Sequence, residues 1–297
     1  MTDSWKYRPP LLSPRFAHEV ARAGDDLFVI GGTDGTTAHG SVETRKVTGS
    51  GEWRHASPMP VPRAALAVGV AGGKVYAAGG TVGESASDVV DRYDPLLDEW
   101  SPAPPLPAPL VSASAAGLGG KLYVAGGNGA DDHATDAVLG YDPEEKRWDP
   151  VAPMRTPRAR FRLLATETHL YAIGGLSGGP RDVLDAVERY SPETDTWEPV
   201  APMHKRRALP GVALLGDRIV VVGGAPAAED PGARDRTTEV LDLGTGAWHL
   251  LGTLLPHGRS SVACVAGPPH RVLAIGGRAN LFGRQATVSD VLSLKVP

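Results

Sequence analysis

The 297-residue sequence has very little cysteine, no block of charge of one sign and no long apolar segment. Its single cysteine, Cys264, excludes a disulfide framework and a zinc site built from cysteines. A formal net charge of −4 lacks the basic character that nucleic-acid binding requires, so we expect no nucleic-acid partner. No signal-peptide core and no membrane-spanning apolar run is present, which predicts a soluble, cytoplasmic protein with no membrane partner.

Glycine, by contrast, is abundant, and six glycine pairs recur at regular intervals along the chain. Each pair closes a short apolar segment, as in the sequence KLYVAGG at residues 121–127. Successive pairs are separated by 48, 47, 48, 49 and 53 residues. A period in this range is typical of a repeat architecture. The pairs begin at Gly31, Gly79, Gly126, Gly174, Gly223 and Gly276.

Arginine and tryptophan keep fixed distances from these glycine pairs. An arginine precedes five of the six pairs by 16 or 17 residues, and Leu110 replaces it in the third copy. A tryptophan follows each of the first five pairs, and seven residues before it stands a tyrosine, Leu241 in the fifth copy or Lys46 in the first. Five equivalent arginines do not make one asymmetric site, so we expect them to be structural. They are Arg15, Arg63, Arg158, Arg207 and Arg259.

Each copy contains four short segments that are typical of antiparallel strands. In the second copy the first two segments are residues 65–71 and 74–78, and the glycine turn between them predicts a hairpin. The third segment ends in Asp-Pro, which favours a turn before the segment that carries the tryptophan. Four such strands make one blade of a propeller, and six blades would bury one another's apolar faces.

The two ends of the chain are expected to share one blade. The last copy supplies a third strand, residues 288–295, but no strand with a tryptophan. Trp5 lies 10 residues before Arg15, as Trp53 does before Arg63, so residues 3–8 should complete the last blade. We therefore predict an all-β, six-bladed β-propeller that forms one domain over residues 1–297. The expected blades are 15–61, 63–108, 110–156, 158–205, 207–256 and 259–297 plus 3–8.

The glycine pair, the tyrosine and the tryptophan are those of the kelch repeat, and the chain resembles a six-bladed kelch propeller over essentially its whole length. The first and fifth copies depart from the pattern by lacking the tyrosine, and the third by lacking the arginine. Kelch proteins that act as ubiquitin-ligase adaptors carry helical domains before the propeller. The sequence offers no such segment, so we expect a stand-alone propeller.

The loop between the second and third strands varies most in length and is expected to lie at the face that binds ligand. Its candidate ligand-binding residues are His39, His133, Arg278, Asn280 and Phe282. In peptide-binding kelch domains an arginine and an asparagine at similar places contact an acidic ligand, which the resemblance extends to Arg278 and Asn280. The two histidines lie two copies apart with no repeating ligand spacing, so we predict no metal site.

Charge on the innermost strand is the sharper signal. Two and four residues after the arginine position most copies have small residues, but the first has Glu19 and the fourth has Arg160 and Arg162. Blades one and four face each other across a six-membered ring, so Glu19 and Arg162 should lie on opposite walls of the channel, with Arg160 nearer its mouth. Burying a charged side chain there costs free energy unless the group is paired with an opposite charge or hydrated. Either a local ion pair, for instance Glu19 with Arg22, or a functional pocket would account for it.

Two functions fit this pattern. The first is binding of an acidic ligand, either a small anion or an acidic peptide, by Arg160, Arg162 and Arg278, because guanidinium groups bind carboxylates and phosphates in pairs of hydrogen bonds. The alternative is a cofactor-independent isomerase, epimerase or lyase in which Glu19 and Arg162 are catalytic. Bacterial sialic-acid mutarotases are also six-bladed kelch proteins, a similarity of architecture only. No cofactor is expected, and the oligomeric state stays open.

Overall fold

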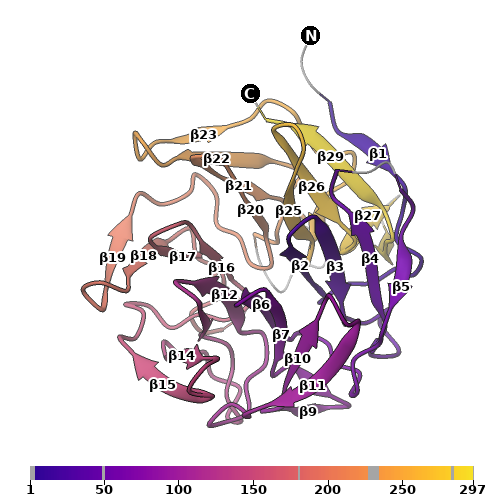
Figure 1. Cartoon of the computed structure of the whole chain (residues 1–297). Helices are drawn as coiled ribbons and strands as arrows, with labels where there is room; N and C mark the ends of the chain where they lie inside the picture. Colours follow the sequence, from indigo (N-terminus) through magenta and orange to yellow (C-terminus); the bar gives the residue numbers. More distant parts are fainter. Residues whose placement is uncertain (1–3, 49–50, 180, 227–233, 282–283, 297) are drawn as a thin grey trace.

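The computed structural model describes residues 4–48, 51–179, 181–226, 234–281 and 284–296, and these form a ring of six four-stranded sheets around a central channel (Figure 1). This is the predicted six-bladed β-propeller. Within the described ranges every regular element is a strand. None of those residues forms a helix of the length and apolar character that would cross a membrane.

Each blade is an antiparallel sheet, and its four strands lie side by side in order from the channel outward. The innermost strands are β2 (Glu19–Ala23), β6 (Ala67–Ala71), β12 (Ser114–Leu118), β16 (Arg162–Ala165), β20 (Gly211–Leu215) and β25 (Ala263–Gly267). The second strands are β3 (Asp26–Ile30), β7 (Lys74–Ala78), β13 (Lys121–Ala125), β17 (Leu170–Ile173), β21 (Arg218–Val222) and β26 (Arg271–Ile275). The third strands are β4 (Val42–Lys46), β10 (Val90–Asp94), β14 (Val138–Asp142), β18 (Val187–Ser191), β22 (Thr238–Asp242) and β29 (Val291–Lys295). The outer strands are β5 (Arg54–Ala56), β11 (Glu99–Ala103), β15 (Arg147–Val151), β19 (Thr196–Val200), β23 (Trp248–Leu250) and β1 (Lys6–Arg8).

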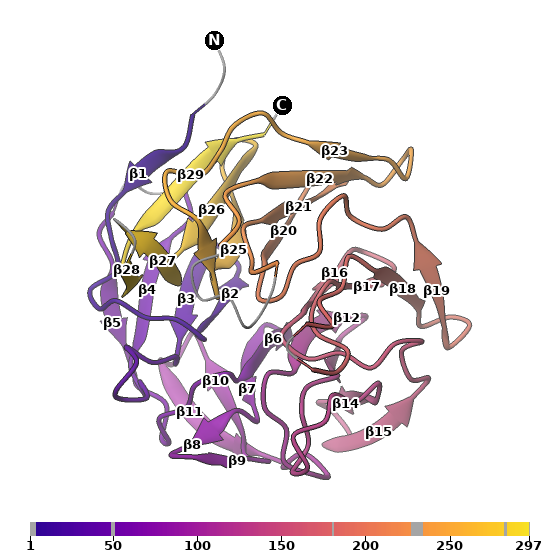
Figure 2. The ribbon, with the colours of Figure 1, turned by 180° about the vertical axis from the view of Figure 1, so that it is seen from behind.

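Five shorter strands lie outside the blades. The pair β8 (Thr81–Val82) and β9 (Ser85–Ala86) forms a small hairpin in the loop after β7. Strands β24 (Arg259–Ser260), β27 (Arg278–Leu281) and β28 (Arg284–Thr287) form a separate three-stranded sheet beside the last blade (Figure 2). This sheet carries Arg278 to the channel mouth.

The N-terminal strand closes the ring, as predicted. Strand β1 pairs antiparallel with β29, with Lys6 opposite Ser293, and the adjacent Trp5 is buried in the core. At every junction the amide of a second glycine donates to the carbonyl at the arginine position of the next blade. The sixth such bond joins Gly277 to Arg15 at 2.8 Å, so the last blade is held to the first as the other blades are to one another.

The glycine pairs are scaffold and make no ligand site. Gly126 has a φ of +58°, and a Cβ at this position would lie 2.2 Å from the carbonyl oxygen of Arg158. A side chain is therefore excluded both by backbone conformation and by the approach of the neighbouring blade.

The five repeated arginines are structural, as expected, because each side chain is fully buried and pairs with a carboxylate of its own blade. Arg63, for example, donates to the carbonyl oxygens of Gly79 and Val89 at 3.1 and 2.6 Å and to Asp91 at 2.5 Å. Each arginine thus ties the connection that precedes a blade to the second and third strands of that blade. The pairs are Arg15 with Glu43, Arg63 with Asp91, Arg158 with Glu188, Arg207 with Glu239 and Arg259 with Asp290.

The third blade has lost both members of this pair. Leu110 stands at the arginine position, and Leu139 stands where the second blade has Asp91, two residues before the tyrosine. Both leucines pack against the apolar cluster between the second and third blades. An aliphatic pair replacing a buried ion pair leaves no unpaired charge, so the exception does not weaken the blade.

In the second, third and fourth blades the tyrosine and the tryptophan pack against each other in the outer part of the sheet. Tyr93 and Trp100 have ring centroids 5.0 Å apart, and the Trp100 indole donates to the carbonyl oxygen of Ser57 in the preceding connection at 2.8 Å. In the first blade the prediction of Lys46 at the tyrosine position is wrong. Arg45 lies opposite Leu27 there, because the turn to Trp53 is one residue longer, and its guanidinium stacks 5.4 Å from the Trp53 ring.

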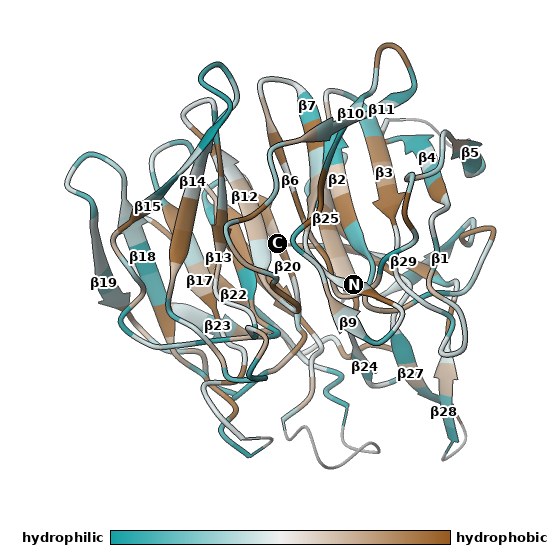
Figure 3. Ribbon diagram, turned by 90° about the horizontal axis from the view of Figure 1, so that it is seen from below, coloured by the Kyte–Doolittle hydropathy of each residue, from teal (hydrophilic) through white to brown (hydrophobic). Residues whose placement is uncertain are grey.

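The core consists of apolar layers between neighbouring blades. One layer, for instance, combines Tyr123 and Ala125 of the third blade with Phe161 and Leu163 of the fourth. Figure 3 shows many apolar residues along the inner and middle strands, whereas the loops at both ends of the ring mix polar and apolar residues. Strands therefore form the walls of the channel, and the loops lie at its two ends.

Candidate functional site

Six equivalent residues form the rim of the channel where each inner strand begins. They all have left-handed backbone conformations, with φ between 50° and 58°. Successive rim residues are joined by backbone hydrogen bonds, such as that from the amide of Arg160 to the carbonyl of Ser112 at 3.0 Å. Because all six copies share this conformation, it belongs to the fold. The rim residues are Ala17, Ala65, Ser112, Arg160, Leu209 and Ser261.

A cavity of about 300 Å³ opens at this rim, and we call it the mouth cavity. The strand starts of all six blades line it, together with loop residues of the fifth and sixth blades. Its apolar lining includes Phe16, Leu66, Phe161 and Leu209, and its hydroxyl groups come from Ser112, Ser260 and Ser261. Its ionisable lining residues are Glu19, Arg160, Arg162, Arg234 and Arg278.

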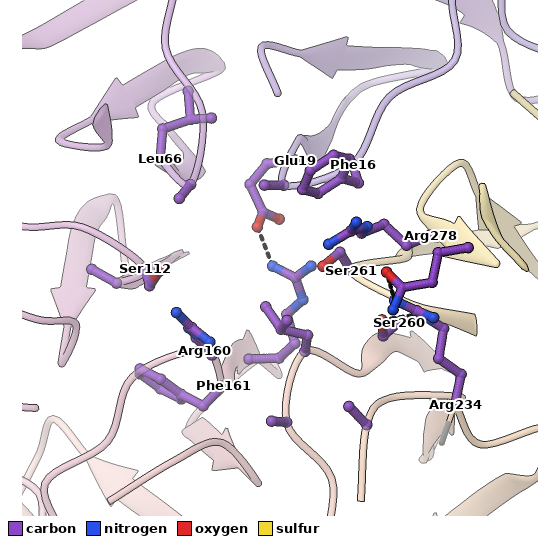
Figure 4. A pocket seen from close by; sticks show the side chains of 18 residues that line it. Phe16, Glu19, Leu66, Ser112, Arg160, Phe161, Arg234, Ser260, Ser261 and Arg278 are labelled. Atoms are coloured by element: carbon purple, nitrogen blue, oxygen red, sulfur yellow. Dashed lines mark hydrogen bonds and ion pairs between the residues drawn. The ribbon is translucent and has the colours of Figure 1, made fainter. Parts of the chain in front are cut away.

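The floor of the mouth cavity is an ion pair across the channel. Glu19 of the first blade and Arg162 of the fourth lie on opposite walls, as their positions in the repeat predict, and Arg162 donates through Nη1 to Glu19 (Figure 4). Its Nε donates to the carbonyl oxygen of Pro210 at 2.9 Å and its Nη2 to that of Val262 at 3.3 Å. The arginine therefore connects four blades at the axis. Arg22, the alternative partner, is instead exposed and donates to the Gly24 carbonyl at 3.0 Å.

Burial changes the proton affinity of this carboxylate. The Glu19 and Arg162 side chains are 20% and 13% exposed. Loss of hydration raises the pKa of Glu19, and the positive charge and hydrogen bond of Arg162 oppose that rise without cancelling it. Glu19 therefore binds a proton more readily than an ordinary glutamate does.

A second cavity of about 380 Å³ lies on the far side of the same ion pair, and we call it the far cavity. Glu19 and Arg162 line both cavities, so their pair divides the channel into two halves. The far cavity is lined by aliphatic and small residues of the inner strands, including Val70, Leu164, Leu214 and Cys264. Burial raises the pKa of the Cys264 thiol to about 12, so this thiol is a poor nucleophile.

Two guanidinium groups of the mouth cavity have no carboxylate partner among the described residues. Arg160 is exposed at the rim, and its side chain forms no hydrogen bond or ion pair with them. Arg278 stacks over Phe16 with its guanidinium carbon 4.7 Å from the ring centroid, and within the described ranges its buried Nε has no hydrogen-bond partner. Both groups can therefore donate to a ligand.

Arg234 is the remaining arginine of the mouth cavity. Its Nε donates to the Ser260 hydroxyl at 2.9 Å and its Nη2 to the side-chain oxygen of Gln285 at 3.1 Å. These bonds fix its place beside Arg278 on the wall formed by the fifth and sixth blades (Figure 4). It contributes positive charge to that side of the cavity.

The structure brings together only part of the predicted site. Glu19, Arg160, Arg162 and Arg278 all line the mouth cavity. Asn280, His39 and His133 are not among its lining residues. The backbone amide of Asn280 donates to the Gly258 carbonyl at 3.2 Å. His133 lies in an exposed turn, where its Nδ1 is 2.8 Å from the Asp131 carbonyl oxygen. Phe282 lies outside the described residues.

His39 belongs to the scaffold beside the first blade. Its amide donates to the Gly32 carbonyl at 2.7 Å, and its ring is half buried close to the Arg15 and Glu43 pair. Among the residues the structure describes, no three His, Cys, Asp or Glu side chains come together as a metal-binding group.

Sequence reasoning missed the aromatic walls of the cavity. Phe16 and Phe161 lie one and three residues after the arginine position, where the other copies have mostly smaller residues. The same alignment of the repeats that singled out Glu19 and Arg162 contains this signal. It shows aromatic substitutions in the first and fourth blades, the two that also carry the charges.

Models of known protein families also match the repeats of this chain. Models of the Kelch motif match residues 62–107, 109–155 and 157–204, which contain the second, third and fourth blades. These three blades are therefore kelch repeats. The solved structure of YjhT superposes on this kelch propeller with a TM-score of 0.83, covering 97% of each chain at 17% sequence identity. A search of curated proteins found no match. At that identity, the similarity to YjhT supports the fold alone.

Proposed function

We propose that this kelch propeller binds a small organic anion in the mouth cavity. The observation that carries the proposal is the convergence of Arg160, Arg162 and Arg278 on one cavity, where Glu19 is the single acidic lining residue in the part of the chain that the structure describes. Guanidinium groups in a site of reduced dielectric bind carboxylate or phosphate oxygens through charge-assisted hydrogen bonds.

The shape of the cavity favours a small molecule over a peptide. The Glu19 and Arg162 pair closes it from below, and its volume of about 300 Å³ is at the lower end of the range for small-molecule sites. The rings of Phe16 and Phe161 give the ligand's carbon skeleton an apolar surface to contact. An acidic peptide would have to bind by inserting a single carboxylate side chain from the rim.

A thermal-shift series with butyrate, benzoate, succinate and sulfate at constant ionic strength tests this function. We expect at least one anion to stabilise the wild type, and the double variant Arg160→Gln/Arg278→Gln to bind it at least tenfold more weakly. Arg147→Gln is the matched control, because Arg147 is an exposed arginine of the outer strand β15 and should leave binding unchanged. The absence of stabilisation by every anion would contradict the proposal.

A second candidate, acid and base catalysis on the same anion, is favoured by one observation. Glu19 lines the cavity, and its burial raises its pKa, which favours a carboxyl group that takes up and returns a proton. No His, Lys, Tyr or Cys side chain lines the mouth cavity among the described residues, so Glu19 would both remove and return the proton. Deuterium uptake from D₂O into a bound 2-oxo or 2-hydroxy acid, absent in Glu19→Gln, would support this reaction. Binding without exchange would leave anion binding as the sole function.

A further inference from the structure

We infer that the ligand of the mouth cavity is a dianion with two separated acidic groups, of the size of a four- to six-carbon dicarboxylate. This inference rests on the proposed function of anion binding and narrows it to one class of ligand. It follows from the charge, the positions and the distinct surroundings of Arg160 and Arg278.

The charge argument starts from the pair on the cavity floor. Arg162 and Glu19 neutralise each other, and Arg162 also donates to two backbone carbonyl groups. Positive charge then remains on two sides of the cavity, from Arg160 on one side and from Arg278 with the neighbouring Arg234 on the other, and neither Arg160 nor Arg278 has a carboxylate partner among the described residues. A monoanion would neutralise one of them, whereas a dianion neutralises both.

The positions of these two arginines require the ligand's charges to be separated. Arg160 precedes β16 of the fourth blade, and Arg278 begins β27 beside the sixth blade, with the fifth blade between them. Figure 4 shows Arg160 and Arg278 on different sides of the ion pair formed by Glu19. One compact anion on one side of the cavity would leave the guanidinium on the other side unpaired.

Each arginine also has its own polar and apolar neighbours. Arg278 is oriented by the Phe16 ring, and its guanidinium has no carboxylate partner among the described residues. On the other side, Ser112 lies next to Arg160 on the rim, and its hydroxyl also lines the cavity. Two half-sites of this kind suit two carboxylate groups.

The space between the half-sites suits a short carbon chain. The lining of the cavity also includes the apolar side chains of Leu66, Leu209, Ala17 and Ala65. A volume of about 300 Å³ equals roughly ten water molecules at their volume in the liquid, and a four-carbon dicarboxylate has a similar number of non-hydrogen atoms. The apolar wall favours methylene groups over further charged groups.

Isothermal titration of the full chain with succinate and butyrate, which share chain length and differ in one carboxylate, tests the inference. We expect succinate to bind about tenfold to a hundredfold more tightly, the gain of one additional charge-assisted contact. In Arg160→Gln and in Arg278→Gln the advantage of succinate over butyrate should fall to less than about threefold, while Arg147→Gln should keep it. Malonate and glutarate, measured in the same way, give the preferred separation of the two groups.

Two results would overturn this inference while leaving anion binding intact. In the first, butyrate binds as tightly as succinate, so the second charge adds nothing. In the second, sulfate at equal ionic strength matches succinate, so the site responds to total charge and not to two separated groups. If none of succinate, butyrate, benzoate and sulfate binds, both the inference and the proposed function fail.

Discussion

Among the described residues, the pairs between a carboxylate and a mostly buried arginine are of two kinds, which differ in repetition and in degree of burial. Five pairs recur at equivalent positions inside the blades, each with an arginine that is 0% exposed and donates to backbone carbonyls as well. The pair of Arg162 with Glu19 occurs once, spans the channel and borders two cavities. The five repeated ion pairs hold the blades together, whereas the pair of Arg162 with Glu19 lies where a ligand can reach it.

The third blade shows that the repeated pair is replaceable when both members change. Leu110 and Leu139 fill the space that an arginine and a carboxylate occupy elsewhere. Nothing comparable occurs in the channel, where four inner strands have small residues at the positions of Glu19 and Arg162. The fold therefore does not require a charged residue at the positions of Glu19 and Arg162. We interpret the one pair that occurs there as functional and not structural.

The largest expected effect comes from breaking a blade pair on one side. Arg63→Leu should lower the free energy of unfolding by about 3–5 kcal/mol, because Asp91 remains buried without its partner. The double variant Arg63→Leu/Asp91→Leu reproduces the third blade and should recover most of the loss. Urea denaturation measures both. A double variant as unstable as Arg63→Leu alone would show that the leucine pair of the third blade depends on other features of that blade.

An intermediate effect is expected at His18, which lies between the two kinds of pair. Its ring is 0% exposed between the last and first blades, and burial together with the charges of Arg15 and Arg162 lowers its pKa to about 3. The unfolded chain therefore takes up a proton below pH 6.5 that the folded chain refuses. Stability is fully present above pH 6.5 and is lost as the pH falls toward 3. Between pH 7 and pH 5 the loss should be about 2 kcal/mol.

The variant His18→Leu isolates this contribution, since Leu66 occupies the equivalent position in the second blade. The difference in unfolding free energy between wild type and variant should change by about 2 kcal/mol from pH 7 to pH 5, whereas carboxylates titrate in both proteins and cancel. The nearest ionisable groups, Arg15, Arg162 and His39, are the same in both. A pH-independent difference would mean that His18 becomes protonated in the folded state.

The smallest effect on stability is expected from the pair in the channel. Glu19→Gln keeps the shape of the side chain and leaves Arg162 its two backbone acceptors, so the free energy of unfolding should change by less than about 1 kcal/mol. Thermal and urea denaturation would detect a larger change. A loss comparable to that of Arg63→Leu would erase the distinction between the two kinds of pair.

Much of the fold can be predicted from the sequence because the same pattern of residues occurs in six copies. The six glycine pairs fix the number of blades, and the interval from Trp5 to Arg15 predicts which strand closes the ring. The error at Lys46 has a simple cause. A turn one residue longer than its counterparts shifts the register, and only the pairing of Arg45 with Leu27 reveals it.

The candidate site was less predictable, because a cavity depends on where loops go after they leave the strands. Glu19, Arg160 and Arg162 could be placed from the sequence, since they lie at fixed offsets on inner strands. Arg278 and Arg234 reach the cavity from loops of unequal length, and His39 and His133 lie in similar loops but do not line it. The spacing of residues within a loop does not encode this difference.

The pairing of β1 with β29 has a consequence for how the protein is made. Lys6 must find Ser293, so the sixth blade cannot be completed until nearly the whole chain has left the ribosome. Until then β1, the outer strand of that blade, has no partner strand. Contacts this distant in sequence form slowly, so we expect the pairing of β1 with β29 to be a late step of folding.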